Sequence, residues 1–550
     1  MKKFNYKIYC FLLVLFLAGC DKSLDLTPKD QISDASFWRT SEHFKLAAND
    51  FYYGLRAEIY KDINSDIAFG AGASPVSNGS FLAPANADLW DDSYEGIRTT
   101  NYLLDKAEKA ALSPAEIDRW VGEALFFRAY HYWNLVKTYG GVPLITKVLD
   151  VTSSELFTEK SSQQKSIDFI IADLDNAATK LPKQSELDAT EIGRVTQGAA
   201  LALKARATLY QGTWNKYHGE GDLTPYLNAA IEASEKVITS AQYALFTEAG
   251  DESYKHLFIL GGDDSKEVIL AKRYYINRTT HNWTRELWFN AMIPTKNLAD
   301  LYLATDGLPI NKSPLFQGYD GLTSEFENRD PRMAMTFVVP GSEIFADGGV
   351  WAPTFPGFTG TNATRTGYML RKFLDETIEA TQFQGSYDFK EFRYGQILLI
   401  LAEALHEKNG QVSDADLDRT INLLRSRVNM PALTNALVNA NGLNMLTEIR
   451  RERTVELAFE GFRREDLRRW KTAENVLPQA IQGVKFAGTE YEQTYPDLQI
   501  GSDIQVDNNG FIIAEPASAR QFLPRHYLDP IPLQQIQLSK GTLTQNTGWQ

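Results

Sequence analysis

A cluster of carboxylates at the start of a helical pattern has the composition of an acid–base site. Its members are Asp88, Asp91, Asp92 and Glu95. A pair of neighbouring carboxyl groups is the catalytic apparatus of most glycoside hydrolases. Carboxylates in the first turn of a helix are, however, favoured by the helix dipole alone. We therefore interpret the cluster as a helix N-terminus and expect no hydrolysis there.

No other pattern of catalytic or metal-binding residues occurs in the sequence. The seven histidines show neither a His-x-x-x-His spacing nor a cysteine partner, so we expect no transition-metal site. A Gly-Lys-Ser/Thr phosphate loop and a Gly-x-Ser-x-Gly nucleophile elbow are both missing. We accordingly expect neither a cofactor nor an enzymatic activity, whereas a surface calcium site stays open.

An apolar run that ends in a cysteine lies close to the N-terminus. Lys2 and Lys3 precede this run, and Leu17-Ala18-Gly19-Cys20 closes it. The run is too short to span a bilayer as a permanent helix, and small residues precede the cysteine as at processing sites. It resembles the lipobox of bacterial lipoproteins, which implies a signal peptide over residues 1–19 and a diacylglycerol on Cys20. We therefore expect the mature protein to stay on a membrane, because two acyl chains anchor stably; an ordinary secretory signal and a buried N-terminal helix are the alternatives.

Composition narrows the classes of partner. Cleavage after residue 19 removes Cys10, so an acylated Cys20 leaves no thiol nucleophile, cysteine-based metal site or intramolecular disulfide. The chain carries 70 acidic and 56 basic residues, a net charge of -14, which argues against nucleic acid as the main partner. Aromatic residues make up 12% of the chain, more than a core usually requires, so we expect some of them to face a ligand.

Loop residues are the candidates for binding a sugar, because sugars offer C–H faces to aromatic rings and hydroxyl groups to amides and carboxylates. The aromatic candidates, all in a loop-rich region with polar neighbours, are Trp283, Trp351 and Phe355, with Trp288 and Phe358 ranked below them. The candidates in the Gly- and Ser-rich segment 64–88 are Asp66, Asn78 and Phe81. For each of them the alternative is a packing role or a solvated loop.

Helical periodicity occurs in two parts of the chain, residues 34–242 and 391–475. Ser113-Pro114 predicts the start of one helix and Gly140-Gly141 its end. An alanine-rich helix is expected to end at Gly212, and one long helix is expected over residues 446–471. Successive helical pairs with small residues beside large aromatics indicate stacked tetratricopeptide-like units, although no clean 34-residue period is visible.

The remaining regions are irregular. Residues 20–33 are expected to be an anchor and linker, residues 243–390 a loop-rich insertion that faces the ligand, and residues 476–550 a mixed C-terminal segment. Strands within the insertion are predicted over residues 267–275 and 335–339. The predicted fold class is therefore mainly α, with a tetratricopeptide-like scaffold that presents this mixed insertion.

Arginines interleaved with carboxylates follow between residues 448 and 469. The arginines are Arg450, Arg451, Arg453, Arg463, Arg464, Arg468 and Arg469, and the carboxylates are Glu448, Glu452, Glu456, Glu460, Glu465 and Asp466. Opposite charges three or four residues apart stabilise a helix. We therefore interpret the run as pairs along one helix rather than as a groove for a polyanion.

The mature chain resembles the SusD/RagB family of outer-membrane nutrient-binding lipoproteins along its whole length. The segments that carry the resemblance are 24–28, Phe37-Trp38, Trp90 with Tyr94, Ile97 and Asn101, 123–130, 139–144, 194–196, 306–310, 329–332, Arg393-Tyr394, 402–404, 448–469, 527–532, Gln545-Asn546 and Gly548-Trp549. The piece Glu123–Tyr130 followed by Tyr139–Leu144 is the most specific of these.

The resemblance implies a non-catalytic glycan receptor on the outer face of the outer membrane. Its partners would be a glycan ligand and a SusC-like TonB-dependent β-barrel transporter that takes up the captured nutrient. Acidic residues soon after the lipidated cysteine favour surface export in this family; here Asp21 and Asp25 flank Lys22, so retention facing the periplasm is an alternative. A peptide-binding or structural subunit of another surface complex is a second function, and a lipoprotein glycoside hydrolase a third.

Overall fold

The computed structural model describes residue 34 and residues 37–57, 59–342, 344–346, 349–351, 364–376 and 384–549, with side chains for all of these except 344–346 and 349–351. Helices dominate this part of the chain, and its strands form two-stranded sheets only. The predicted mainly α fold class is therefore confirmed. No helix within the described ranges is long and apolar enough to cross a bilayer.

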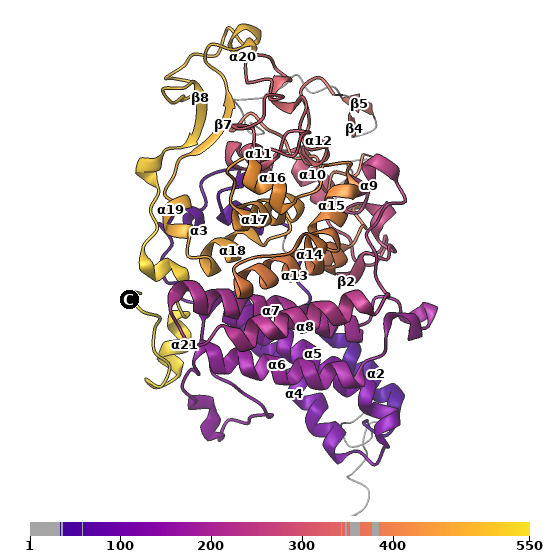
Figure 1. The fold of residues 1–550 in the computed structure, drawn as a ribbon. Helices are drawn as coiled ribbons and strands as arrows, with labels where there is room; N and C mark the ends of the chain where they lie inside the picture. Colours follow the sequence, from indigo (N-terminus) through magenta and orange to yellow (C-terminus); the bar gives the residue numbers. More distant parts are fainter. Residues whose placement is uncertain are drawn as a thin grey trace, which may run out of the picture.

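Long helices of the N-terminal half form a stack in the lower part of Figure 1. They are α2 (Ser41–Asn49), α4 (Asp88–Lys109), α5 (Pro114–Tyr139), α6 (Gln163–Lys180), α7 (Gln197–His218) and α8 (Thr224–Thr239). From α4 onward each helix packs against the next, so that neighbouring helical pairs share one continuous core.

Local sequence signals set the two ends of α5. Ser113 and Glu116 form a capping box at its start, where Pro114 occupies the first turn. Gly140 ends the helix with a φ of 74°, a left-handed conformation that glycine adopts without a steric penalty. Both predicted ends of this helix are confirmed.

Gly212, in contrast, does not end α7, which continues to His218. A Cβ atom on Gly212 would lie 2.8 Å from Leu227 Cδ2 of α8. The glycine therefore allows α8 to approach α7 closely, and the prediction of a helix end there was wrong because it considered only the local breaking tendency of glycine.

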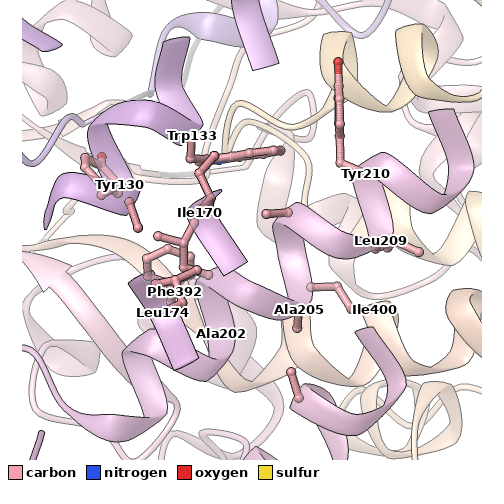
Figure 2. Close-up of a cluster of buried hydrophobic side chains, with 14 of the residues drawn as sticks. Tyr130, Trp133, Ile170, Leu174, Ala202, Ala205, Leu209, Tyr210, Phe392 and Ile400 are labelled. Atoms are coloured by element: carbon pink, nitrogen blue, oxygen red, sulfur yellow. The ribbon is translucent and has the colours of Figure 1, made fainter. Parts of the chain in front are cut away.

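The centre of the helical stack is a tightly packed hydrophobic core. Figure 2 shows Trp133 of α5 beside Ile170 of α6, and Ala202 of α7 beside Leu174 and Phe392. Trp133 is 1% exposed, and Ala202 and Ala205 of α7 are fully buried. Small side chains on α7 thus pack beside large apolar ones in this core, as the sequence pattern predicted.

A second helical group follows the insertion. It comprises α13 (Tyr394–Asn409), α14 (Asp414–Asp418), α15 (Ile421–Arg427), α16 (Asn435–Ala440), α17 (Met445–Glu456), α18 (Arg463–Arg469) and α19 (Ala473–Val476). Helix α13 packs on α7 and α8 and joins this group to the N-terminal stack. The single helix predicted over residues 446–471 is two helices, because Phe459 and Gly461 adopt φ angles of 65° and 84° while the Phe459 ring is fully buried.

Short elements make up the upper part of Figure 1 and the chain's end. The antiparallel strand pairs are β1 (Ala68–Gly70) with β3 (Met292–Pro294), β2 (Val268–Lys272) with β6 (Phe389–Arg393), β4 (Ile344–Ala346) with β5 (Gly349–Trp351), and β7 (Ile481–Lys485) with β8 (Phe511–Glu515). The short helices are α3 (Pro75–Asn78), α9 (Ser253–His256), α10 (Trp283–Trp288), α11 (Lys296–Leu301), α12 (Arg332–Thr336), α20 (Glu490–Thr494) and α21 (Leu533–Leu538). The strand predicted over 267–275 corresponds to β2, but residues 335–339 overlap α12 and contribute only the bridge of Phe337 to Leu370.

Candidate functional site

The segment 64–88 and the insertion lie against each other in the structure. Strand β1 pairs with β3 in antiparallel register, with Phe69 opposite Ile293. Just before β1, the Thr295 hydroxyl donates a hydrogen bond of 2.7 Å to the backbone carbonyl of Asp66. Segment 64–88 and the insertion, which hold the predicted ligand contacts, are therefore joined at this point of the fold.

A polar cleft of about 470 Å³ lies where these segments meet α18, α19 and β7. Its lining residues are Asp66, Asn297, Leu301, Arg463, Asn475, Val476, Gln479, Ala480, Gln482 and Ala517. Four of these ten residues carry side-chain amides, and Asp66 is the one carboxylate among them. We call it the Asp66 cleft. Amides offer both donors and acceptors, which is what a ligand rich in hydroxyl groups requires.

Asp66 is held in place by an arginine from α18. Arg463 Nε donates to Asp66 Oδ1 at 2.8 Å and Nη2 donates to Oδ2 at 2.9 Å. An ionised carboxylate has about four acceptor positions, so this two-pronged pair leaves Asp66 able to accept further hydrogen bonds. The arrangement fixes the carboxylate in one orientation without using up its capacity to bind.

Asp62 fixes the backbone just before α18. Its Oδ2 accepts a hydrogen bond of 3.1 Å from the Gly461 amide, and its Oδ1 accepts one of 3.2 Å from the Arg463 amide. Complete burial raises the pKa of Asp62 to about 7, although these two hydrogen bonds act in the opposite direction. The start of α18, and with it the wall of the Asp66 cleft, is thus attached to the segment before β1.

The interleaved arginines pair mainly with distant segments. Arg464 binds Asp529 at 2.6 Å, and Arg453 binds Asp466 of the next helix at 2.8 Å. Within the run, pairs three residues apart are found for Arg451 with Glu448 and for Arg469 with Asp466. The interpretation as pairs along one helix is therefore corrected: the run folds into two helices, and its buried guanidinium groups need partners from elsewhere in the fold.

Glu456 is the centre of this buried network. Its carboxylate accepts hydrogen bonds from Arg332, Arg393 and Arg427 at distances of 2.7–2.9 Å. These arginines outweigh the effect of burial and hold the pKa of Glu456 well below its usual range. The charges of this region are therefore internal supports of the fold rather than a surface for polyanions.

Trp283 is a packing residue in this structure. It is 6% exposed, and its ring stacks on His281 with the ring centroids 3.6 Å apart. Tyr274 and Tyr387 contact it edge-on at centroid distances of 5.2 and 5.6 Å. No open ring face is left for a sugar, so its selection as an exposed stacking platform is not supported. The insertion shares a second core with residues far from it in the sequence, such as Ile59 and Phe459, which its local sequence does not reveal.

Three other predicted ligand contacts also pack against distant segments of the chain. Trp288 is half-buried against Val338, Met369 and Leu374. The Asn78 amide donates to Glu515 at 2.9 Å, and the Phe81 ring meets Trp549 edge-on at a centroid distance of 5.8 Å. Both interactions attach segment 64–88 to the C-terminal part of the chain.

The remaining candidates stay predictions. Cys20, Phe355 and Phe358 lie outside the described residues, and Trp351 is described only through its backbone in β5. Conversely, the sequence analysis missed Asn297, Gln479 and Gln482 of the Asp66 cleft. No local signal marks them, because they come together only through the contact of α11, α19 and β7.

The acidic cluster forms the N-terminal part of α4, which begins at Asp88. Asp92 pairs with Arg56 at 3.1 Å. This confirms the cluster as a helix N-terminus. Over the residues with described side chains, no group of three or more His, Cys, Asp or Glu is arranged to hold a metal ion.

The fold and the cleft define a tetratricopeptide-like helical scaffold that presents irregular, polar segments. Residues 263–549 match the SusD family, and residues 74–209 match the SusD-like group described as "Starch-binding associating with outer membrane". The first match alone covers more than half of the chain, so the chain belongs to the SusD family. The resemblance inferred from the sequence is confirmed.

Relatives match over most of the chain. A SusD-like protein of Formosa agariphila is 26% identical over 534 residues, which cover 87% of this chain and 94% of that protein. The starch-binding protein SusD of Bacteroides thetaiotaomicron is 28% identical over 279 residues, which cover 48% of this chain and 43% of that protein. The crystal structure of a SusD-like carbohydrate-binding protein from Bacteroides fragilis has a TM-score of 0.75 at 26% identity and covers 92% of this chain and 99% of its own.

Proposed function

We propose that this chain is a cell-surface lipoprotein that binds glycans and delivers them to a SusC-like TonB-dependent outer-membrane transporter. The observation that carries the proposal is membership of the SusD family together with the close structural likeness to a relative described as carbohydrate-binding. The lipobox ending at Cys20 supports the anchor, and the description of the matched group supports the outer membrane as its location.

The Asp66 cleft is the proposed place of capture. Sugar hydroxyl groups would donate to Asp66 and exchange hydrogen bonds with the amides of Asn297 and Gln482. Because Arg463 already fixes Asp66, little conformational entropy of that side chain is lost on binding. Trp351 and Phe355 are the proposed rings for stacking on the sugar faces.

Binding without hydrolysis fits the chemistry of this cleft. Asp66 is the one carboxylate in its lining and is paired with Arg463 at 2.8 Å, whereas most glycoside hydrolases use two neighbouring carboxyl groups. Incubation of the mature protein with labelled oligosaccharides should therefore return them intact. Release of smaller products would establish the hydrolase instead.

Isothermal titration of the mature chain against a panel of polysaccharides tests the site. Asn297→Ala, Gln482→Ala and Trp351→Ala should each weaken binding by about ten-fold, the effect of losing one good contact. Asn176→Ala, an exposed amide on α6, is the matched control and should bind like the unmodified protein. Undiminished binding in all three cleft and loop variants would remove this site assignment.

Fractionation and co-purification test the anchor and the partner. Cys20→Ala should move the protein out of the membrane fraction, because no acyl chain can then be attached. Purification from membranes of the producing cell should bring along a TonB-dependent transporter. A different, stoichiometric partner would favour the peptide-binding or structural subunit.

A further inference from the structure

A second polar cleft, of about 550 Å³, lies between the 3-10 helix η1 (Asp50–Gly54), α4, α5 and β2. Its volume is within the range of about 300–1,000 Å³ that is typical of small-molecule sites. It shares no lining residue with the Asp66 cleft. We call it the His131 cleft, after the imidazole in its buried wall.

Three buried polar side chains line this cleft without a protein partner. Ser93, His131 and Asn134 are 2%, 5% and 2% exposed. None of the three side chains forms a hydrogen bond with any residue that the structure describes. The polar atoms of these side chains are not among the fully buried ones that lack a partner, so they keep access to the cleft and can bond to water or a ligand there.

The position of His131 depends on two glycines. A Cβ on Gly54 would lie 2.7 Å from the imidazole Cε1, and a Cβ on Gly96 would lie 2.1 Å from Nε2. Gly96 lies inside α4, where glycine weakens a helix relative to alanine. Burial lowers the pKa of His131 to about 4, so its ring is neutral near pH 7 and offers one donor and one acceptor.

The basic groups of the His131 cleft have partners within its wall. Arg56 Nη1 lies 3.1 Å from Asp92 Oδ2, and Lys272 Nζ donates to the Leu55 carbonyl at 2.7 Å. Two exposed acidic residues, Asp50 and Glu95, also line the cleft. These carboxylates disfavour an anion, and the neutral side chains of Ser93, His131 and Asn134 offer donors and acceptors to an uncharged ligand.

An exposed aromatic ring adds an apolar surface to the His131 cleft. Tyr53 lines the cleft and is 84% exposed, so both faces of its ring are open to solvent. Aromatic rings bind the C–H faces of sugars, and hydroxyl groups next to them require mixed donors and acceptors. The combination of Tyr53 with Ser93, His131 and Asn134 meets both requirements.

We propose that the His131 cleft binds a single neutral sugar unit, through the open ring of Tyr53 and the hydrogen-bonding groups of Ser93, His131 and Asn134. This makes it a second carbohydrate site, separate from the Asp66 cleft. The choice of a sugar as the ligand rests on the proposed function, whereas the position of the site rests on the cleft alone.

Titration of the mature chain with methyl glycosides of glucose, galactose, mannose and xylose, followed by NMR, tests the proposal. At least one should bind, and Asn134→Leu and Tyr53→Ala should each weaken that binding by about ten-fold or more. Asn134→Leu should unfold at an unchanged or higher temperature, because no hydrogen bond within the protein is lost. Tyr275→Ala removes another exposed tyrosine, 48% exposed, and should have no effect.

The outcomes separate the two proposals. Both sites are supported if Asn297→Ala weakens polysaccharide binding while Asn134→Leu does not, and if Asn134→Leu weakens methyl glycoside binding while Asn297→Ala does not. If polysaccharides bind but no methyl glycoside does, or if Asn134→Leu and Tyr53→Ala bind it like the unmodified protein, the His131 site is overturned and the proposed function stands. Failure of every polysaccharide and every glycoside to bind overturns both.

Discussion

Asp66 and Arg463 form a two-pronged ion pair that spans 397 residues of the sequence. The two side chains are 4% and 12% exposed, so the pair is largely shielded from water. It joins the segment before β1 to α18 and at the same time fixes the carboxylate of the proposed capture site. The stability of the fold and the geometry of the cleft therefore depend on the same contact.

Removal of one partner should destabilise the protein strongly. We expect Asp66→Ala or Arg463→Ala to cost about 3–5 kcal/mol of unfolding free energy, because each leaves an uncompensated buried charge. The double variant should lose less than the sum of the two. Denaturant titration measures the free energy of unfolding of the two single variants and the double variant. The control is Glu232→Ala, which breaks the exposed pair with Lys236 and should change stability by less than about 1 kcal/mol. Strictly additive losses would contradict this account.

Trp283 should contribute to stability rather than to affinity. Trp283→Ala removes a ring that contacts His281, Tyr274 and Tyr387, and should lower the free energy of unfolding by about 3–5 kcal/mol. The folded variant should retain glycan affinity in isothermal titration at a temperature where it remains native. Normal stability with lost binding would restore the sequence-based choice of Trp283 as a ligand contact.

Gly483 of β7 has no room for a side chain. A Cβ there would lie 1.8 Å from the backbone carbonyl oxygen of Thr366, which cannot move as a flexible side chain does. We expect Gly483→Ala to lower the free energy of unfolding by at least about 2 kcal/mol. Gly72→Ala is the matched control, since no atom lies within 4 Å of its Cβ position. Equal melting temperatures of the two variants would argue against the close packing of β7.

Glu325 should make stability depend on pH. Burial raises its pKa from 4.5 to about 7, although the Tyr368 hydroxyl donates a hydrogen bond to it at 2.9 Å. The folded protein therefore holds a proton there that the unfolded chain releases near pH 4.5. Its contribution is fully present below that pH and is lost as the pH rises to about 7, on the order of 3 kcal/mol in total.

Glu325→Gln isolates this contribution, because glutamine accepts the same hydrogen bond but does not titrate. The melting temperature of the variant should fall less than that of the unmodified protein between pH 4.5 and 7. Glu108→Gln, at an exposed position on α4, serves as the control and should follow the unmodified protein. Parallel curves for all three proteins would refute the raised pKa.

Local signals in the sequence determined the long helices. The capping box at Ser113, the proline after it and the glycine at 140 specify the ends of α5 through contacts within a few residues. Apolar spacing predicted the buried faces, and the ordered motifs predicted the family. These features can be predicted from the sequence because each depends on residues that are neighbours in the chain.

The roles of the side chains in the irregular segments depend on the tertiary structure and could not be predicted from the sequence. Trp283 and Trp288 looked exposed in a loop-rich sequence, yet they pack in small cores that the insertion builds with distant residues. Asn297 and Gln482 carry no local mark, and they meet Asp66 because β1 pairs with β3 and α18 reaches back to it. Burial and pairing between residues hundreds of positions apart follow from how the whole chain packs, and a pattern of neighbouring residues does not contain that information.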